Sequence, residues 1–248
     1  MFLRIFLKLL NINWLHFRPA DCFPKHCFCE EINAGLVRQP VNAYSNLIYI
    51  AVGLYIIVNL IYFSKKRLKI SSQTNLPRKI LFIFACASIV VGIGSFVYHA
   101  GFTFLGEQLD DDGMYLTGSF LLLNFISRLK KFSVLHFLLF YTIINVPLEI
   151  LIYIHPSVRG LVFGLLILVT LLIEKNVFKK IPDRNQVKYL VFGVGLFFVG
   201  YLIWILDYTK ILCFPHSIFQ GHAVWHLLTG LAILFLYFFM DSEYIKRN

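Results

Sequence analysis

Two histidines lie four residues apart near the C-terminal end of the chain, in the segment from Gly221 to His226. On a helix, this spacing places the imidazoles of His222 and His226 on one face, where their ring nitrogens can converge on one metal ion. A histidine inside a membrane segment is costly and usually marks a functional site. We therefore expect this pair to supply two of the three protein ligands of a catalytic zinc site.

The composition indicates an integral membrane protein. Of the 248 residues, 58% are apolar and 15% are charged, and the mean hydropathy is +0.73. Such a chain has too little polar surface to cover a soluble globule. The net charge of +10 does not indicate a nucleic-acid partner, because the basic residues fall in short clusters between apolar runs instead of on one soluble face.

Seven apolar runs have the length of membrane-spanning helices. They predict an all-α polytopic membrane protein whose seven helices lie near 43–63, 80–101, 112–127, 133–154, 157–174, 188–206 and 220–240. We expect an N-terminal segment over 1–42, the membrane domain over 43–240 and a tail over 241–248. Within the first 15 residues, an uncleaved amphipathic helix at the membrane interface is favoured over a signal peptide.

Basic residues gather in alternate loops, which predicts the orientation of the chain. They lie at 65–69 and 78–79, at 128–131, at 175–188 and in the tail at 246–247. The positive-inside rule places these loops in the cytoplasm, so the N-terminus is expected outside and the C-terminus inside.

This topology brings a third histidine to the depth of the first two. The second helix carries Ser95 and His99 near its outer end, four residues apart and on one face, and the last helix begins at the same depth with His222. Between the second and third helices, we expect a short acidic connection from Gln108 to Met114, which begins the third helix. Three imidazoles, a hydroxyl and a carboxylate are thus predicted near the outer leaflet.

These residue types form a catalytic zinc constellation, in which the protein leaves one position open for water. Zinc lowers the pKa of such a water to about 7, so hydroxide is available at neutral pH. Asp110 would act as general base and later protonate the leaving group, and Ser95 would orient the water or donate to the oxyanion. Asp111 and Asp112 adjoin Asp110, and the choice of Asp110 rests on its spacing from His99 and Met114.

The remaining histidines join no comparable group. We interpret them as structural residues, with His136 and His155 in or beside apolar runs and the others in or near loops: His16, His26 and His216. Glu149, near the outer end of the fourth helix, is either a residue of the substrate pathway or a carboxylate that reaches for the interface.

Together these motifs resemble the alkaline ceramidase family, seven-helix intramembrane hydrolases related to the adiponectin-receptor-like proteins. The resemblance extends over about residues 27 to 240. The matching segments are Ser95-x-x-x-His99, the turn from Asp110 to Met114, Gly221-His222-Ala223-x-Trp225-His226, Trp204-x-x-Asp207 followed by Cys213, Cys29-Glu30-Glu31, and Asn42-Ala43-Tyr44-Ser45-Asn46.

The resemblance implies zinc on the three histidines and hydrolysis of the amide bond of ceramide, giving a sphingoid base and a fatty acid. The residues alone indicate only hydrolysis of a membrane lipid, since the predicted site lies where the polar linkage of an amphiphile would sit. Two alternatives remain: a hydrolase of another N-acyl lipid, and a seven-helix lipid receptor with a structural zinc ion. A haem protein is disfavoured, because histidines at i and i+4 on one helix cannot approach opposite faces of a haem.

Animal members of this family carry an N-terminal calcium site, from which this chain departs. Glu30 and Asn33 resemble two of its ligands, but one extra residue lies in the segment that contains them, and Gln39 stands where a carboxylate would align. A neutral amide in place of a charge weakens a site for a hard cation. The sequence therefore argues against calcium regulation here.

We predict a disulfide between Cys29 and Cys213, which the charge rule places together on the outer face. The alternative is a local pair between Cys29 and Cys22, because connectivity cannot be read from sequence. Cys22 and Cys27 remain as a second pair or as free thiols, and Cys86, inside the second helix, is expected to stay reduced.

Overall fold

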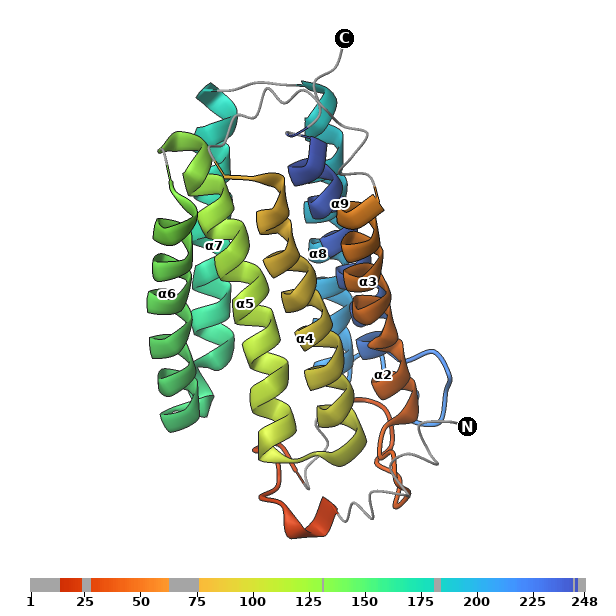
Figure 1. Ribbon diagram of the computed structural model, residues 1–248. Helices are drawn as coiled ribbons and strands as arrows, with labels where there is room; N and C mark the ends of the chain where they lie inside the picture. The colour runs from red at the N-terminus through yellow and green to blue at the C-terminus, as the bar shows by residue number, and fades with distance from the viewer. Residues whose placement is uncertain are drawn as a thin grey trace.

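The computed structural model describes residues 14–23, 28–62, 76–130, 132–180, 184–242 and 244. Within these ranges the chain is helical and forms no strand, and seven long helices form a bundle (Figure 1). Their bounds are α3 Leu47–Tyr62, α4 Leu81–Gly101, α5 Phe104–Leu129, α6 Val134–Ile154, α7 Arg159–Lys180, α8 Arg184–Tyr208 and α9 Gly221–Ser242. Four short helices accompany them: η1 Trp14–His16, α2 Pro40–Ser45, η2 Arg78–Ile80 and η3 Pro156–Val158. The predicted seven-helix, all-α architecture is confirmed.

Six helical stretches in the described residues are long and apolar enough to cross a membrane: Pro40–Tyr62, Arg78–Gly101, Val134–Ile154, Pro156–Val177, Val187–Tyr208 and Gly221–Ser242. The protein is therefore a multi-pass membrane protein. Its outer helices expose large apolar side chains, such as Leu135 (65% exposed), Leu161 (68%) and Leu202 (61%). Such surfaces suit contact with hydrocarbon and would be costly in water.

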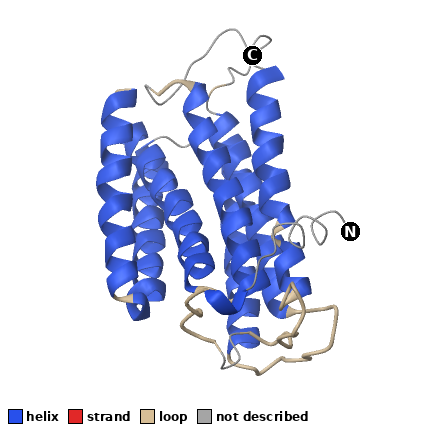
Figure 2. Ribbon diagram, turned by 60° about the horizontal axis from the view of Figure 1, so that its bottom comes forward, coloured by secondary structure: helices blue, strands red, loops and turns tan. Residues whose placement is uncertain are grey.

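The helices pack around a central pair, α4 and α5. Helix α3 packs on α4 and α9, α8 pairs with α9, and α6 and α7 pack on α5. Helix α2 and the connection from α8 to α9 lie at one end of the bundle, as do the start of α5 and the end of α4 (Figure 1). Figure 2, turned to bring this end forward, shows the loops that gather there.

The prediction of an acidic connection before the third helix is wrong. Helix α5 begins at Phe104, eight residues before the expected start, and residues 108–114 are helical. Phe102 adopts the left-handed conformation (φ 46°, ψ 47°) and ends α4, and the Thr103 hydroxyl then accepts a hydrogen bond from the Gly106 N–H at 3.1 Å. A left-handed C-cap followed at once by an N-cap leaves no room for a longer loop, so the carboxylates fall within the first turns of a helix.

Helix α2 and the start of α9 lie at one end of the bundle, and the end of α9 lies at the other (Figure 1).

Which end of the bundle faces the cytoplasm stays a prediction. Residues 1–13, which include most of the expected interfacial helix, lie outside the described residues, as do most of the first basic cluster and the last residues of the tail.

Candidate metal centre

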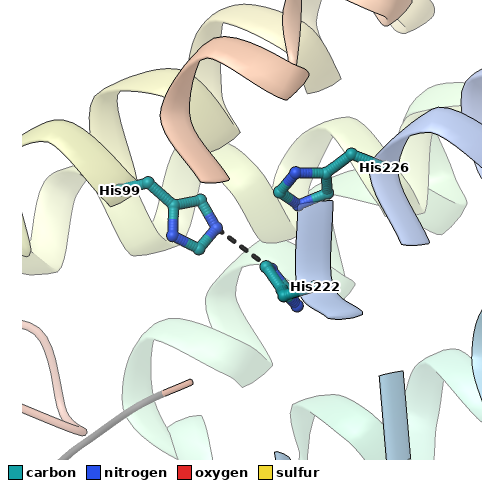
Figure 3. Close-up of side chains that lie close together, drawn as sticks. All are labelled: His99, His222 and His226. Atoms are coloured by element: carbon teal, nitrogen blue, oxygen red, sulfur yellow. Dashed lines mark hydrogen bonds between the residues drawn. The ribbon is translucent and has the colours of Figure 1, made fainter. Parts of the chain in front are cut away.

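Three buried histidines from two helices meet at this end of the bundle. His99 lies in the last turn of α4, and His222 and His226 occupy the first two turns of α9. Each offers a ring nitrogen within 4.8 Å of the other two, and the Nε2 atoms of His99 and His222 are 3.1 Å apart. Figure 3 shows the three rings turned toward a common point. The predicted histidine group is therefore brought together by the fold.

Two of these rings are held from behind through their Nδ1 atoms. The Oε1 atom of Gln39 lies 3.1 Å from Nδ1 of His99, and the Oγ atom of Ser45 lies 2.7 Å from Nδ1 of His226. His222 is held differently: its ring stacks on Phe28, with centroids 3.6 Å apart. Its Nδ1 atom is buried without a hydrogen-bond partner among the described residues.

The donor set fits a metal ion. The three imidazoles are at most 4% exposed, and their ring nitrogens lie close to one another. Converging nitrogen lone pairs repel one another, so a bound cation would stabilise this arrangement. Three nitrogen ligands with one position left open is the pattern of catalytic zinc sites. The group can therefore hold a metal ion.

Ser95 and Asp110 lie beside this group. Ser95 precedes His99 by one turn of α4, and its side chain hydrogen-bonds to the Asp110 carboxyl group. Asp110 also interacts electrostatically with Tyr49 and Tyr98. These two rings contact the His226 and His99 rings, with centroids 6.1 Å and 5.0 Å apart. The hydroxyl and the carboxylate thus belong to the surroundings of the histidine group.

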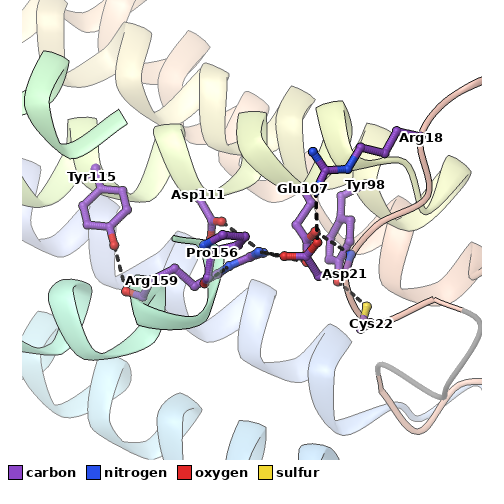
Figure 4. A network of polar contacts seen from close by, with 9 residues as sticks. All are labelled: Arg18, Asp21, Cys22, Tyr98, Glu107, Asp111, Tyr115, Pro156 and Arg159. Atoms are coloured by element: carbon purple, nitrogen blue, oxygen red, sulfur yellow. Dashed lines mark hydrogen bonds and ion pairs between the residues drawn. The ribbon is translucent and has the colours of Figure 1, made fainter. Parts of the chain in front are cut away.

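Asp111 faces a different set of residues. Arg159, at the start of α7, lies 2.6 Å from Glu107 Oε1, 3.3 Å from Asp111 Oδ2 and 2.6 Å from Asp21 Oδ2. Figure 4 shows this network, which links the N-terminal segment to α5 and α7. Asp110 and Asp111 therefore have different direct partners: Asp111 pairs with Arg159, whereas Asp110 hydrogen-bonds with Ser95. Glu149 interacts electrostatically with Asp111.

The N-terminal segment is fastened to the start of α9. A disulfide joins Cys29 to Cys213, with Cα atoms 5.3 Å apart. Asp207, fully buried at the end of α8, accepts hydrogen bonds from the Cys29 N–H at 2.9 Å and the His222 N–H at 3.1 Å. Asp207 stands in one of the motifs that resemble the family, but no role was expected for it from the sequence. Its signal was only a carboxylate at the end of an apolar run.

The two residues considered for calcium lie in the same segment. Both carboxylate oxygens of Glu30 accept backbone hydrogen bonds at 2.8 Å, one from Val41 and one from Asn42. Burial raises the pKa of the Glu30 carboxyl group, and these two donors act against that shift. Asn33 is exposed and donates to the Arg38 carbonyl oxygen at 3.3 Å. Glu30 therefore accepts hydrogen bonds from the first N–H groups of α2. The expectation that calcium does not regulate this protein stays a prediction.

Among the described residues, the metal-ligand group includes none of the other histidines and cysteines singled out from the sequence. His136 hydrogen-bonds with Ser133 at an exposed helix start, and His216 pairs with Glu31 at 2.9 Å on the surface. Cys86 is free. Cys22 is disulfide-bonded. Cys27 and His26 lie outside the described residues.

The sequence of this chain matches the family model described as Ceramidase over residues 25–248. The chain belongs to the ceramidase family. The matched region contains the three histidines, Ser95, Asp110 and the Cys29–Cys213 disulfide. The family resemblance of the motifs is therefore confirmed.

Two curated ceramidase relatives come from Dictyostelium discoideum. The chain is 25% identical to one named "Putative alkaline ceramidase dcd3B" over 245 residues, which cover 87% of this chain and 85% of the relative. It is 27% identical to one named "Putative alkaline ceramidase dcd3A" over 225 residues, which cover 79% and 77%. The similarity to both ceramidase relatives thus extends over most of each chain.

Proposed function

We propose that this protein is a zinc-dependent amide hydrolase that cleaves ceramide-like N-acyl sphingolipids to a sphingoid base and a fatty acid. The observation that carries the proposal is the convergence of three buried imidazoles beside a hydrogen-bonded Ser95–Asp110 pair. Membership of the ceramidase family and the printed names of the two relatives support the substrate class.

His99, His222 and His226 would hold the zinc ion. When bound there, zinc supplies Lewis-acid chemistry that makes a water molecule acidic enough to lose its proton near neutral pH. A site with three protein nitrogens leaves room for water and substrate.

Asp110 takes up the proton of the attacking water as the oxygen bonds to the amide carbonyl carbon. It then gives this proton to the nitrogen of the leaving amine as the C–N bond breaks, so the carboxylate is regenerated. Ser95 donates a hydrogen bond from its hydroxyl group to Asp110 and so keeps the carboxylate turned toward the histidine group. The products are a free amine and a carboxylic acid.

The location of the site supports an amphiphilic substrate. The histidines lie at one end of a bundle whose outer helices expose apolar side chains. A lipid can therefore keep its tails in hydrocarbon while its amide reaches the site. The alternation of basic loops supports a location of this end at the extracytoplasmic leaflet, which the positive-inside rule predicts.

The test is to incubate the detergent-purified protein with ceramide and a panel of other N-acyl lipids, and to measure released fatty acid by mass spectrometry. We expect ceramide turnover by the wild type and by His136→Ala, and none by His222→Ala. Preferred cleavage of another N-acyl lipid would revise the substrate. Bound zinc without any lipid cleavage would support a receptor with a structural metal and contradict the proposal.

A further inference from the structure

We propose that Gln39 and Ser45, which begin and end the α2 region, are positioning residues that fix the tautomers of His99 and His226. In this arrangement, each ring presents the lone pair of its Nε2 atom to the metal. The inference rests on the proposed function, because it concerns the same three-histidine site. In the sequence, Gln39 was considered only as a departure from the calcium site, and Ser45 was assigned no role.

The orientation of the Gln39 amide is set by its other contacts. Its Nε2 atom lies 2.6 Å from the Glu30 carbonyl oxygen, which can only accept a hydrogen bond, so this end of the amide must be the donor. The Oε1 atom therefore faces His99 at 3.1 Å, and it also accepts from the Asn42 side chain at 3.1 Å. An oxygen that only accepts requires a proton on Nδ1 of His99, which leaves Nε2 as the lone pair.

The same argument applies to Ser45. Its hydroxyl donates to the Asn42 carbonyl oxygen at 2.7 Å, so the single hydroxyl proton is already used. Toward Nδ1 of His226, at 2.7 Å, the oxygen can then only accept. The Asn42 carbonyl is a second acceptor for this ring, and carbonyls never donate. His226 is therefore also protonated on Nδ1, with Nε2 free.

The start of α2, which follows Gln39, is fastened to the helix that carries His99. The Arg38 and Gln39 N–H groups donate to the carbonyl oxygens of Ala100 and His99, each at 3.1 Å, which fastens the start of α2 to the end of α4. Gln39 is fully buried, and Glu30 accepts from the first N–H groups of the helix. Such outer partners orient a ligand ring and raise its basicity, and their loss typically weakens metal binding by about 10- to 100-fold.

Two substitutions at Gln39 separate this role from a merely structural one. Gln39→Met and Gln39→Glu both remove the donor to the Glu30 carbonyl, but only Gln39→Met also removes the acceptor that faces His99. The readout is the zinc dissociation constant, measured by competition with a chelator in calcium-free buffer, which does not depend on turnover. We expect zinc binding about 10- to 100-fold weaker in Gln39→Met and close to wild type in Gln39→Glu.

A second pair of variants tests Ser45. Ser45→Ala removes an acceptor of His226, whereas Tyr44→Phe removes a hydroxyl from the neighbouring residue, which is 43% exposed. We expect weaker zinc binding only in Ser45→Ala, and less weakening than in Gln39→Met because the Asn42 carbonyl remains. Equal zinc affinity in Gln39→Met and Gln39→Glu would overturn this inference alone. A wild-type protein that binds no zinc would overturn the proposed function, and this inference with it.

Discussion

Gly94 on α4 lies directly against Leu109 on α5: a Cβ atom at Gly94 would stand 2.3 Å from the Leu109 carbonyl oxygen. Only glycine allows the two backbones to come this close. The contact brings Ser95, the next residue on α4, to Asp110, the next residue on α5. The geometry of the proposed catalytic pair, Ser95 and Asp110, therefore depends on glycine at position 94.

Gly94→Ala should therefore separate the two helices at this point. The added methyl group meets backbone atoms, which cannot move aside as a side chain would. We expect a loss of about 1–3 kcal/mol in the free energy of unfolding, and hydrolysis reduced by about 10²-fold because Asp110 is displaced. Thermal unfolding and fatty-acid release measure the two effects. Gly195→Ala is the control, since a Cβ atom there meets nothing within 4 Å. Wild-type turnover in Gly94→Ala would show that the close approach is not needed.

The seven helices could be predicted from apolar runs, of which six are long and apolar enough to cross a membrane. The pairs Ser95/His99 and His222/His226 could be placed by helical spacing. The start of α5 could not. The run of carboxylates formed by Glu107 and the three aspartates is typical of a loop. In the structure it is helical, and Glu107 and Asp111 pair with Arg159 at the start of α7.

The partners of the histidines were also beyond sequence reasoning, because each contact joins residues far apart in the chain. Gln39 lies 60 residues from His99, and Ser45 lies 181 residues from His226. Asp207 contacts Cys29 across 178 residues. No local pattern encodes such pairs. Two long-range contacts were anticipated from the expected membrane topology: the Cys29–Cys213 disulfide and the meeting of His99 with His222 and His226.

Asp110→Asn should separate chemistry from metal binding. The amide keeps the size of the side chain but cannot accept the proton of the attacking water, so we expect hydrolysis reduced by about 10²-fold or more with zinc retained. Zinc content by mass spectrometry and fatty-acid release give the two readouts. Asp111→Asn is the matched comparison and should affect stability more than turnover, because Asp111 faces Arg159. If Asp111→Asn instead lost turnover with its stability unchanged, the assignment of Asp110 would be wrong.

Arg159→Leu should destabilise the fold. It leaves the buried Glu107 and Asp111 carboxylates without their cation, and we expect a loss of about 3 kcal/mol, the lower end for a broken buried pair, since Arg159 is 20% exposed. Adding Glu107→Gln should restore part of the loss, because it removes one of the unpaired charges. Chemical denaturation in mild detergent measures all three proteins. An Arg159→Leu variant as stable as the wild type would contradict the structural role of this network.

Removing the disulfide with Cys29→Ser and Cys213→Ser should weaken the attachment of the N-terminal segment beside His222. We expect a loss of at most about 4 kcal/mol in stability, with zinc still bound because Asp207 continues to link Cys29 and His222. The free cysteine provides the control: Cys86→Ser should leave the unfolding temperature unchanged. An unfolding temperature that does not fall in the double variant would show that Asp207 alone fastens the segment.

A zinc ion on His99, His222 and His226 is proposed to support amide hydrolysis. The decisive experiment removes metal from the purified protein with a chelator, adds zinc back in steps, and measures both bound zinc and fatty acid released from ceramide. We expect turnover that is absent without zinc and rises in proportion to bound zinc up to one ion per chain. Full turnover by the zinc-free protein, or none by protein that holds one zinc ion per chain, would contradict it.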